Sequence, residues 1–387
     1  MRKAWVVAVG FFLICAFVVG AVSNGWLDSS APLAILPTRM PSTPDPSQAI
    51  KLQIVYSSEK DIWLKQTVNT WLATKPTVDG KPIQVELIAR GSQEIVSQLE
   101  AGNLRPTAIS PASSLQITQI NAAQIDGKTN LAADAQPLLI SPLVLVSYEG
   151  SPASKLVKSQ DAQFWQALHD GVLLPMRNQK ILMSQTSPTT SNSGFQAWVL
   201  MAYAYHNKAN GLTAADISDP KFVEWLQGYA KNVEQFAEST GSLMLKMVQV
   251  GPSTYGAAVV YESTALEYLP KSQGRFGKLL LLYPPQNLYS DHPLAILDAS
   301  WSSVDQREAA GLLREFLLEK DQQTTAVQQG FRPVDPDVAI DAADSPFVKY
   351  QSAGVQMSIA NLAAEPDAAT IKAVLDLWNS IEPSVKR

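Results

Sequence analysis

The chain has 387 residues, of which 46% are hydrophobic and 17% charged, so it can bury two or three hydrophobic cores. Its 30 basic and 35 acidic side chains give a net charge of -5, which excludes the basic composition typical of a nucleic-acid binder. The single cysteine, Cys15, excludes an intrachain disulfide and a cysteine-based zinc site. His169, His206 and His292 are too dispersed to predict metal ligation. We therefore expect no metal, no cofactor and no nucleic-acid partner.

Residues 1–23 have the composition of a signal peptide or an N-terminal membrane anchor. Arg2 and Lys3 precede an uncharged apolar run, 4–22, so the positive end is expected to stay in the cytoplasm while the rest of the chain is exported. The run is long enough for an uncleaved anchor, and the Ala-Val-Ser sequence at its end suits signal cleavage. Both alternatives place the chain in the periplasm or at the extracellular face of the cytoplasmic membrane, anchored by 4–22 if cleavage does not occur.

Residues 24–50 contain repeated prolines among serines and threonines. This composition predicts an extended tether that holds the folded part away from the membrane. An ordered arm packed on the folded part is the alternative.

From residue 51 onward, short β-rich runs alternate with amphipathic helical stretches, which predicts an α/β fold with mostly parallel sheets. Segments 52–56 and 83–88 are predicted strands, each followed by a helix. The longer apolar segment 138–147 predicts a strand that crosses between two lobes. Further strands are expected at 181–183, 257–261, 278–283 and 294–297, and a capping box at Ser303 and Gln306 predicts a helix that runs through Leu318.

Three strand-to-helix turns carry clustered hydroxyl groups. They contain Ser57 with Ser58, Ser110 with Ser113 and Ser114, and Ser191 with Ser193. In an open α/β sheet, ligands bind at the carboxyl ends of strands, where helix N-termini offer free N–H groups. Each serine could instead cap its own helix, but three such turns in one chain favour a shared site for a polar ligand.

Three charged residues are further candidates. Arg90 follows a predicted strand and Arg332 a Gly-Phe turn, positions from which a guanidinium could clamp an oxyanion. A surface ion pair is the alternative for both. Glu262 follows the predicted strand 257–261, so its carboxylate is expected at the carboxyl end of that strand. There it could bind an amine, hydroxyl or cation, or pair with a lysine between the lobes.

Two enzyme or metal motifs are incomplete. Residues 298–302 match the D-x-S-x-S metal-adhesion pattern, but no further ligand loop is evident after them. Residues 251–256 have one residue too many for G-x-S-x-G, and no histidine has an evident catalytic partner. We therefore expect no enzymatic activity, and a hydrolase is a distant alternative.

Several short segments then occur in a fixed order: PTAISPASS at 106–114, TSPTTSNSG at 186–194, EST at 238–240, YES at 261–263, YPP at 283–285, DHPL at 291–294 and GFRP at 330–333. This series resembles the bacterial extracellular solute-binding proteins of the type II periplasmic-binding-protein fold, the group related to molybdate- and sulfate-type binding proteins of ABC transporters. The resemblance runs from about residue 51 to about residue 333.

The resemblance implies two α/β lobes, each a mostly parallel mixed sheet flanked by helices, with two crossover strands as a hinge. Lobe 1 is expected at 51–140 plus 286–387 and lobe 2 at 141–285. The ligand-binding residues that we expect, from the resemblance together with the strand-end positions, are Ser57, Ser58, Arg90, Ser110, Ser113, Ser191, Ser193, Tyr261 and Glu262.

The expected function is that of an exported monomer that captures a small polar ligand, an oxyanion or a small organic solute, for the permease of an ABC importer. The alternative is a membrane-tethered interaction or sensory module that keeps the fold without a transport role.

Overall fold

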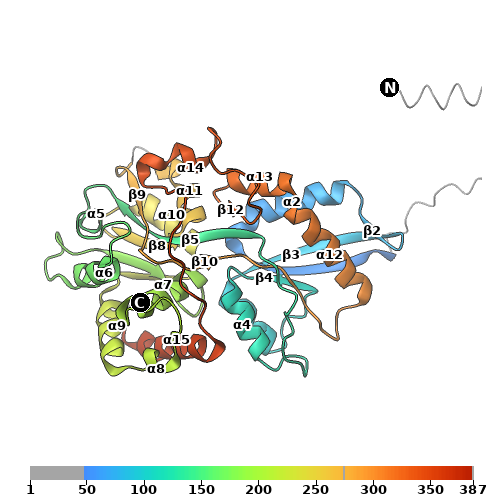
Figure 1. Ribbon diagram of the computed structural model, residues 1–387, viewed down its shortest axis with the longest axis horizontal. Coiled ribbons are helices and arrows are strands. Elements are labelled where there is room, and N and C mark those ends of the chain that lie inside the picture. Colours follow the sequence, from blue (N-terminus) through green and yellow to red (C-terminus); the bar gives the residue numbers. More distant parts are fainter. Residues whose placement is uncertain (1–47, 273–274, 386–387) are drawn as a thin grey trace, which may run out of the picture. The chain divides into compact units, whose positions relative to one another are not determined.

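The structure is a computed structural model that describes residues 48–272 and 275–385 (Figure 1). The predicted signal or anchor at 1–23 and most of the predicted tether at 24–50 lie outside the described residues. Within the described ranges, no helix is both long enough and apolar enough to cross a membrane.

The first sheet has five strands. In order of pairing they are β11 (Ala295–Ile296), β4 (Ala108–Ser110), β1 (Ile50–Ser57), β3 (Lys81–Arg90) and β2 (Thr77–Val78). β1 pairs in parallel with β3 and β4, whereas β2 and β11 run antiparallel to their neighbours at the edges. This sheet and its helices form the first lobe.

Helices cover both faces of the first sheet. On β1, Ile54 packs into one core and Val55 into another, because successive side chains of a strand point to opposite faces. The Ile54 face is covered by α2 (Asp61–Ala73), α12 (Val304–Leu318) and α13 (Lys320–Gln328), and the Val55 face by α3 (Ser92–Glu100) and α4 (Ser114–Ala122). Burial on both faces explains why the second half of β1 is apolar at Ile54, Val55 and Tyr56, whereas Lys51 near its start is exposed.

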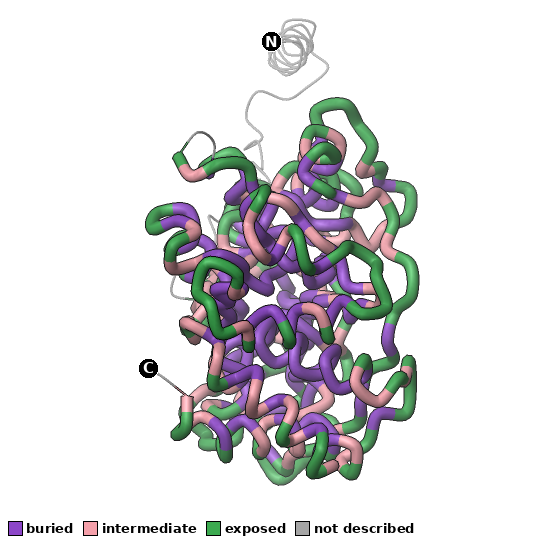
Figure 2. The backbone as a smooth tube through the Cα atoms, turned by 90° about the vertical axis from the view of Figure 1, so that its left-hand side faces the viewer, coloured by how far each residue is buried: buried purple, intermediate pink, exposed green. Residues whose placement is uncertain are grey.

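The second sheet lies mostly in the second lobe. Its strands pair in the order β10 (Tyr289–Ser290), β5 (Leu139–Tyr148), β8 (Ala257–Tyr261), β6 (Met183–Thr186) and β7 (Gln235–Ala237), and β9 (Leu279–Leu282) and β12 (Arg332–Pro333) also pair with β5. The helices around it are α5 (Pro152–Leu156), α6 (Phe164–Leu173), α7 (Asn192–Tyr205), α8 (Ala214–Ile217), α9 (Pro220–Asn232), α10 (Thr240–Val250), α11 (Glu262–Tyr268) and α14 (Pro346–Lys349). In Figure 2 the buried residues lie along the inner strands and helices, with exposed residues in the outer turns.

β5 and β10 connect the two lobes. β5 follows the last helix of the first part of lobe 1 and continues into the second sheet, and β10 leads back to β11 in the first sheet. The two strands pair antiparallel, with Tyr289 opposite Pro142. The sequence predicted a crossing strand at 138–147, and β5 lies within one residue of it.

The C-terminal helix α15 (Ala368–Ile381) packs differently from our expectation. Residues 286–387 were expected in lobe 1, yet Ile371, Val374 and Trp378 lie in the core of lobe 2. The rings of Trp198 and Trp378 meet edge to face at 5.2 Å. The three apolar side chains recur at helical spacing and need an apolar face, which α7, α8 and α9 supply (Figure 1). The helix also contacts α4 of lobe 1.

The segment before α15 also packs on lobe 2. Val338, Phe347 and Val355 share a core with Val144 and Leu243. We propose that lobe 1 comprises 51–140 plus 286–333 and that lobe 2 comprises 141–285 plus 334–387.

Candidate functional site

A pocket of about 510 Å³ lies where strand ends of the two lobes face each other. Its volume is in the range of small-molecule sites. We call it the interlobe pocket, and it is lined by Ser58, Glu59, Gly91, Ser92, Glu94 and Ser97 from lobe 1 and by Thr189, Thr190, Ser191, Glu238 and Ser239 from lobe 2. These residues follow β1, β3, β6 and β7, as expected for a ligand site at the carboxyl ends of strands.

Three helices begin at the interlobe pocket. Gly91, Ser191 and Ser239 are the N-cap residues of α3, α7 and α10. The hydroxyl of Ser239 accepts a hydrogen bond from the backbone N–H of Ser242 at 3.2 Å, so it caps its own helix. Ser191 makes no such capping bond, and its hydroxyl is 3.3 Å from that of Thr240.

The structure brings only part of the predicted site to the pocket surface. Of the nine expected ligand residues, Ser58 and Ser191 line the interlobe pocket. Arg90 does not line it and pairs with Glu94 at 3.2 Å. This is the ion pair that the sequence left open as the alternative to an oxyanion clamp.

The other predicted serines are buried behind the pocket wall. The Ser193 hydroxyl is 2.8 Å from those of Thr186 and Thr240. Ser113 caps α4 by accepting the backbone N–H of Leu115 at 3.2 Å. The bonds of Ser193 hold its turn in place. The bond of Ser113 is helix capping, which we gave above as the alternative to ligand binding.

A second set of predicted residues surrounds a buried lysine that the sequence reasoning missed. Lys60 is fully buried, and its Nζ donates to the Ser57 hydroxyl at 2.6 Å and the Ser110 carbonyl at 2.8 Å. It lies 3.4 Å from Nδ1 of His292. An ammonium can only donate, so Nδ1 accepts and Nε2 carries the imidazole proton. We call Lys60, Ser57, Ser110 and His292 the Lys60 cluster.

Several polar atoms beside this cluster are buried without a hydrogen-bond partner. They are the hydroxyl of Ser110, Nε2 of His292 and Oε2 of Glu59; the Tyr261 hydroxyl, also buried, lies beside the side chains of Asn192 and Ser290. Burial, and secondly the charge of Lys60, lowers the pKa of His292 well below its ordinary value, so the ring is neutral. Buried polar atoms without partners are uncommon, and here they lie close to the ends of β1, β4 and β10.

Glu262 is held by an ion pair with Arg332 of β12. Arg332 donates from Nε to one carboxylate oxygen of Glu262 at 2.7 Å and from Nη2 to the other at 2.8 Å. The hydroxyl of Tyr283 donates to the same carboxylate, and Arg332 also binds the Met357 carbonyl. Glu262 is completely buried. Its carboxylate therefore binds Arg332 and Tyr283 of the protein itself, whereas we expected it to bind the ligand. The guanidinium of Arg332, considered above as an oxyanion clamp, is bound to Glu262.

Side-chain amides join the two lobes directly. Gln116 of α4 donates to Asn192 of α7 at 3.0 Å, and Gln196 donates to the Ser113 hydroxyl at 3.4 Å. Ser290 of β10 donates to Gln196 at 2.9 Å. The lobes thus meet in a closed arrangement. Asn192 lies in the TSPTTSNSG segment, but its amide was not among the expected residues.

Comparison with known proteins shows the family. The family described as bacterial extracellular solute-binding protein matches residues 52–332. The chain belongs to this family. No curated protein matches the sequence.

Solved structures share the two-lobed fold. The sulfate-binding protein SubI from Mycobacterium tuberculosis H37Rv is 19% identical with a TM-score of 0.54, covering 88% of this chain and 100% of that one. The ferric binding protein from Campylobacter jejuni is 14% identical with a TM-score of 0.57, covering 85% and 99%. A periplasmic thiamin binding protein is 11% identical with a TM-score of 0.58, covering 89% and 99%. The predicted two-lobed α/β fold is confirmed.

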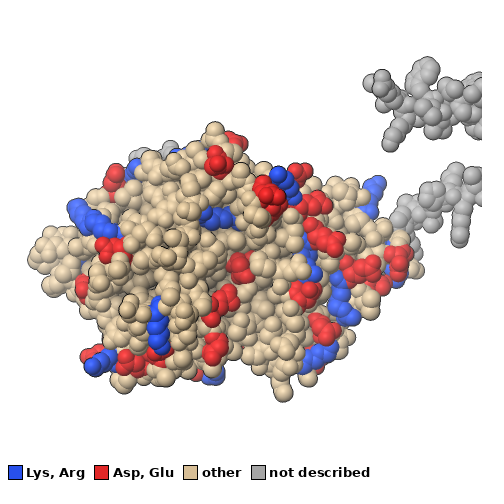
Figure 3. All heavy atoms as spheres, viewed as in Figure 1, with Lys and Arg blue, Asp and Glu red and all other residues tan. Residues whose placement is uncertain are grey.

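The interlobe pocket of this solute-binding protein is acidic. Glu59, Glu94 and Glu238 line it, and no lysine or arginine does. Arg90 compensates Glu94. Several acidic side chains also lie along the middle of the face in Figure 3, where β5 and β10 join the lobes in Figure 1.

Two opposing charges act on an anion in this pocket. The carboxylates of Glu59 and Glu238 repel it, whereas the N-termini of α3, α7 and α10 attract it.

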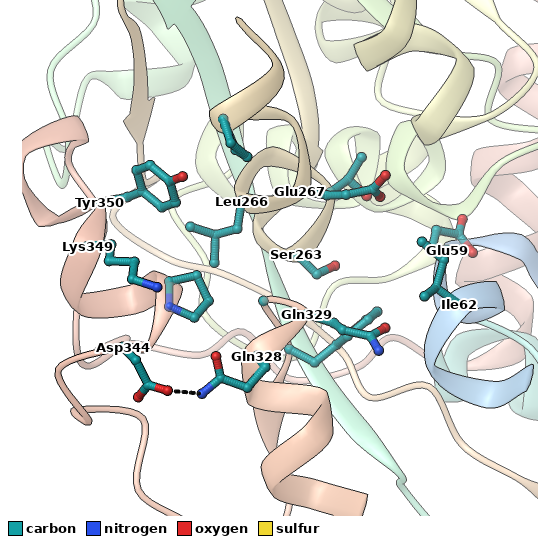
Figure 4. Close-up of a pocket in the computed structure, with 15 residues that line it drawn as sticks. Glu59, Ile62, Ser263, Leu266, Glu267, Gln328, Gln329, Asp344, Lys349 and Tyr350 are labelled. Atoms are coloured by element: carbon teal, nitrogen blue, oxygen red, sulfur yellow. Dashed lines mark hydrogen bonds between the residues drawn. The ribbon is translucent and has the colours of Figure 1, made fainter. Parts of the chain in front are cut away.

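A second pocket, of about 330 Å³, lies on another side of Glu59. Figure 4 shows Glu59 and Ile62 on one wall, with Ser263 and Glu267 of α11 across from them. Its remaining walls come from α13, α14 and adjacent residues. Glu59 and Ser263 follow the carboxyl ends of β1 and β8, but the other walls are mostly sides of helices, so this pocket is the weaker candidate for the solute.

Lys60 gives a testable pH dependence. Burial lowers its pKa to about 7, against the opposing charges of Glu59 and Asp291. Between about pH 7 and 9 the folded protein loses this proton while the unfolded chain keeps it, so the free energy of unfolding rises with pH, by at most about 1.4 kcal/mol per unit. Urea unfolding at several pH values should show this rise. The rise should disappear in Lys60→Met and persist in the exposed-lysine control Lys65→Met; equal slopes in wild type and Lys60→Met would refute the assignment.

Proposed function

We propose that the protein is an exported solute-binding protein that captures a small polar ligand between its two lobes and delivers it to the permease of an ABC importer. The observation that carries this proposal is the interlobe pocket, whose walls come from strand ends of both lobes. Family membership supports a binding role. The structurally similar proteins named above are described as binding sulfate, ferric iron or thiamin, so the shared fold accommodates ligands of different chemistry.

The proposal includes the N-terminal segment and the mode of action. Residues 1–23 direct export and remain as an anchor if uncleaved, which keeps the protein near the permease. The protein acts as a monomer and performs no catalysis. β5 and β10 act as the hinge, and closure removes the solute from water, as in other hinged two-lobe proteins.

Thermal unfolding of the full chain against molybdate, sulfate, phosphate, sugars, amino acids and amines tests the proposal. A solute present at about 100 times its Kd stabilises the folded state by about 2.7 kcal/mol. We expect one chemical class to raise the unfolding temperature. No rise with any class would contradict solute binding and favour a membrane-tethered interaction module with the same fold.

Gly91 provides a test of lobe closure. A Cβ atom at this position would lie 2.6 Å from the Thr190 carbonyl oxygen of the other lobe, although the backbone of Gly91 suits any residue. We expect Gly91→Ala to weaken solute binding about tenfold or more, since such overlap costs about 1–3 kcal/mol in the closed state. Without solute its free energy of unfolding should change by no more than about 0.5 kcal/mol, because the open lobes leave room for the methyl group.

Isothermal titration calorimetry with the solute found by thermal unfolding measures this effect. Gly241→Ala is the matched control, because a Cβ there meets no atom within 4 Å and the residue lies in the first turn of α10. Equal affinities of Gly91→Ala and Gly241→Ala would show that the solute binds without closure of this gap.

A further inference from the structure

We propose that the C-terminal helix α15 is a clasp, which closes on lobe 1 when the lobes close and thereby sets the affinity for the solute. This inference deepens the proposed function and rests on it. The helix packs one face on the core of lobe 2 and also contacts α4 of lobe 1 (Figure 1). It therefore joins the lobes at a place separate from the hinge strands.

Two different sides of α15 serve the two lobes. Ile371, Val374 and Trp378 are buried in the core of lobe 2. A second set of side chains, at most four residues apart, lies along one stripe of the helix and lines a cleft of about 460 Å³. We call this set the outer stripe, and it consists of Ala368, Lys372, Leu375, Asp376 and Asn379.

The opposite wall of this cleft comes from lobe 1. It is formed by one side of α3 and by the end of α4, with Gln93, Val96, Ser97, Glu100, Gln119, Ala122 and Ala123. Ser97 and Thr189 line both the cleft and the interlobe pocket. The outer stripe thus faces lobe 1 directly beside the proposed solute site.

The contact between the outer stripe and lobe 1 is of a kind that can open and close. Most of the side chains that line the cleft are polar or are alanines, and polar interfaces with unfilled space permit motion between domains. Lys372 and Asp376 pair with each other at 2.6 Å, so opening leaves neither charge without its partner. Leu375, with Val96 on the other wall, supplies apolar surface that leaves water when the lobes approach.

The segment before α15 attaches the helix to the hinge. Asn287, just before β10, donates its backbone N–H to the Asn361 carbonyl at 3.0 Å and accepts that of Ala363 at 2.8 Å. Its side-chain amide binds the backbone N–H and carbonyl of Leu143 in β5, at 2.9 and 2.8 Å. Since β5 and β10 join the lobes, a rotation about them changes the separation of α15 and lobe 1.

Leu375 and Leu377 form a matched pair that separates a clasp from a static support. Both are partly buried and pack on the core of lobe 2, but Leu375 lines the cleft toward lobe 1 and Leu377 does not. Urea unfolding without solute should show that Leu375→Ala and Leu377→Ala lower the stability of the full chain by similar amounts. A helix that only completes lobe 2 predicts that they also bind solute equally.

Calorimetric titration of the two variants measures the effect on binding. The titrant is whichever of molybdate, sulfate, phosphate, the sugars, the amino acids or the amines gives the largest rise in unfolding temperature. We expect Leu375→Ala to bind it about fivefold or more weakly than the wild type, because the closed state is less populated. Leu377→Ala should remain within about twofold of the wild type.

Thiol labelling reports the movement of the clasp itself. In the full chain with Cys15 replaced by serine, Leu375→Cys should react with N-ethylmaleimide about threefold or more slowly once the titrant has closed the lobes. Leu377→Cys should react at the same rate with and without the titrant.

Equal affinities of Leu375→Ala and Leu377→Ala, or a labelling rate of Leu375→Cys that the titrant does not change, would overturn the clasp while leaving solute binding intact. If none of the compounds raised the unfolding temperature, the proposed function would fail, and the clasp with it.

Discussion

Replacing Arg332 with methionine is expected to lower the free energy of unfolding by about 3–5 kcal/mol. The guanidinium makes two bonds to Glu262, at 2.7 and 2.8 Å, and one to the Met357 carbonyl. Glu262 is fully buried, so the variant leaves a carboxylate with no cation in the protein interior. Breaking a buried ion pair from one side costs more than the pair contributes, because the remaining charge is not solvated.

Urea unfolding of three variants separates this effect from a general loss of charge. Arg177→Met removes an exposed pair with Glu234 at 3.4 Å and is expected to change stability by about 1 kcal/mol or less. The double variant Arg332→Met with Glu262→Gln should recover part of the loss, because no buried charge is left alone. A loss below about 1 kcal/mol in Arg332→Met would show that Glu262 is solvated or paired in another way.

Replacing Trp378 with alanine is expected to lower the free energy of unfolding by about 3–5 kcal/mol. Its side chain is 1% exposed and packs edge to face on Trp198 at 5.2 Å. Loss of the ring leaves a cavity between α15 and the helices of lobe 2, and a well-packed core closes such a cavity only in part.

Thermal and urea unfolding of Asn379→Ala provides the comparison. Asn379 is the next residue of α15 and is exposed, so its replacement should change stability by no more than about 0.5 kcal/mol. If Trp378→Ala were no less stable than Asn379→Ala, α15 would not be part of the lobe 2 core.

Local signals in the sequence predict most of the fold. The predicted strand 257–261 coincides with β8 (Ala257–Tyr261), and the helix predicted from the capping box ends at Leu318 as α12 does. In that box Gln306 accepts the backbone N–H of Ser303 at 2.9 Å. Apolar runs and caps are formed by residues close together in the chain, which is why a single sequence reveals them.

Long-range pairings are not encoded in such local patterns. The position of α15 depends on which lobe offers an uncovered apolar face, and both lobes contain amphipathic helices. Glu262 meets Arg332 only after the chain has crossed from one lobe to the other. Lys60 lies two residues after Ser58 of the predicted serine turn. From sequence alone a lysine at such a position is expected to be solvated, because lysines are rarely buried.

The sequence predicted the location of the candidate site better than the residues that line it. The hydroxyl-rich turns mark the strand ends that form the pocket, and Ser58 and Ser191 line it. Glu59 and Glu238 were overlooked although Glu59 follows the first of those turns and Glu238 begins the EST segment. Their importance comes from the absence of a basic lining residue, which depends on how the two lobes face each other.

The most direct test of solute capture between the lobes is a distance measured across the interlobe pocket. Spin labels on cysteines introduced at the exposed positions Glu100 and Ser242, in the full chain with Cys15 replaced by serine, place one label on each lobe. Double electron–electron resonance should show a broad distribution of longer distances without solute. The solute that raises the unfolding temperature should produce a single shorter distance, and Gly91→Ala should shift the population back. A distribution that no solute changes would contradict the account.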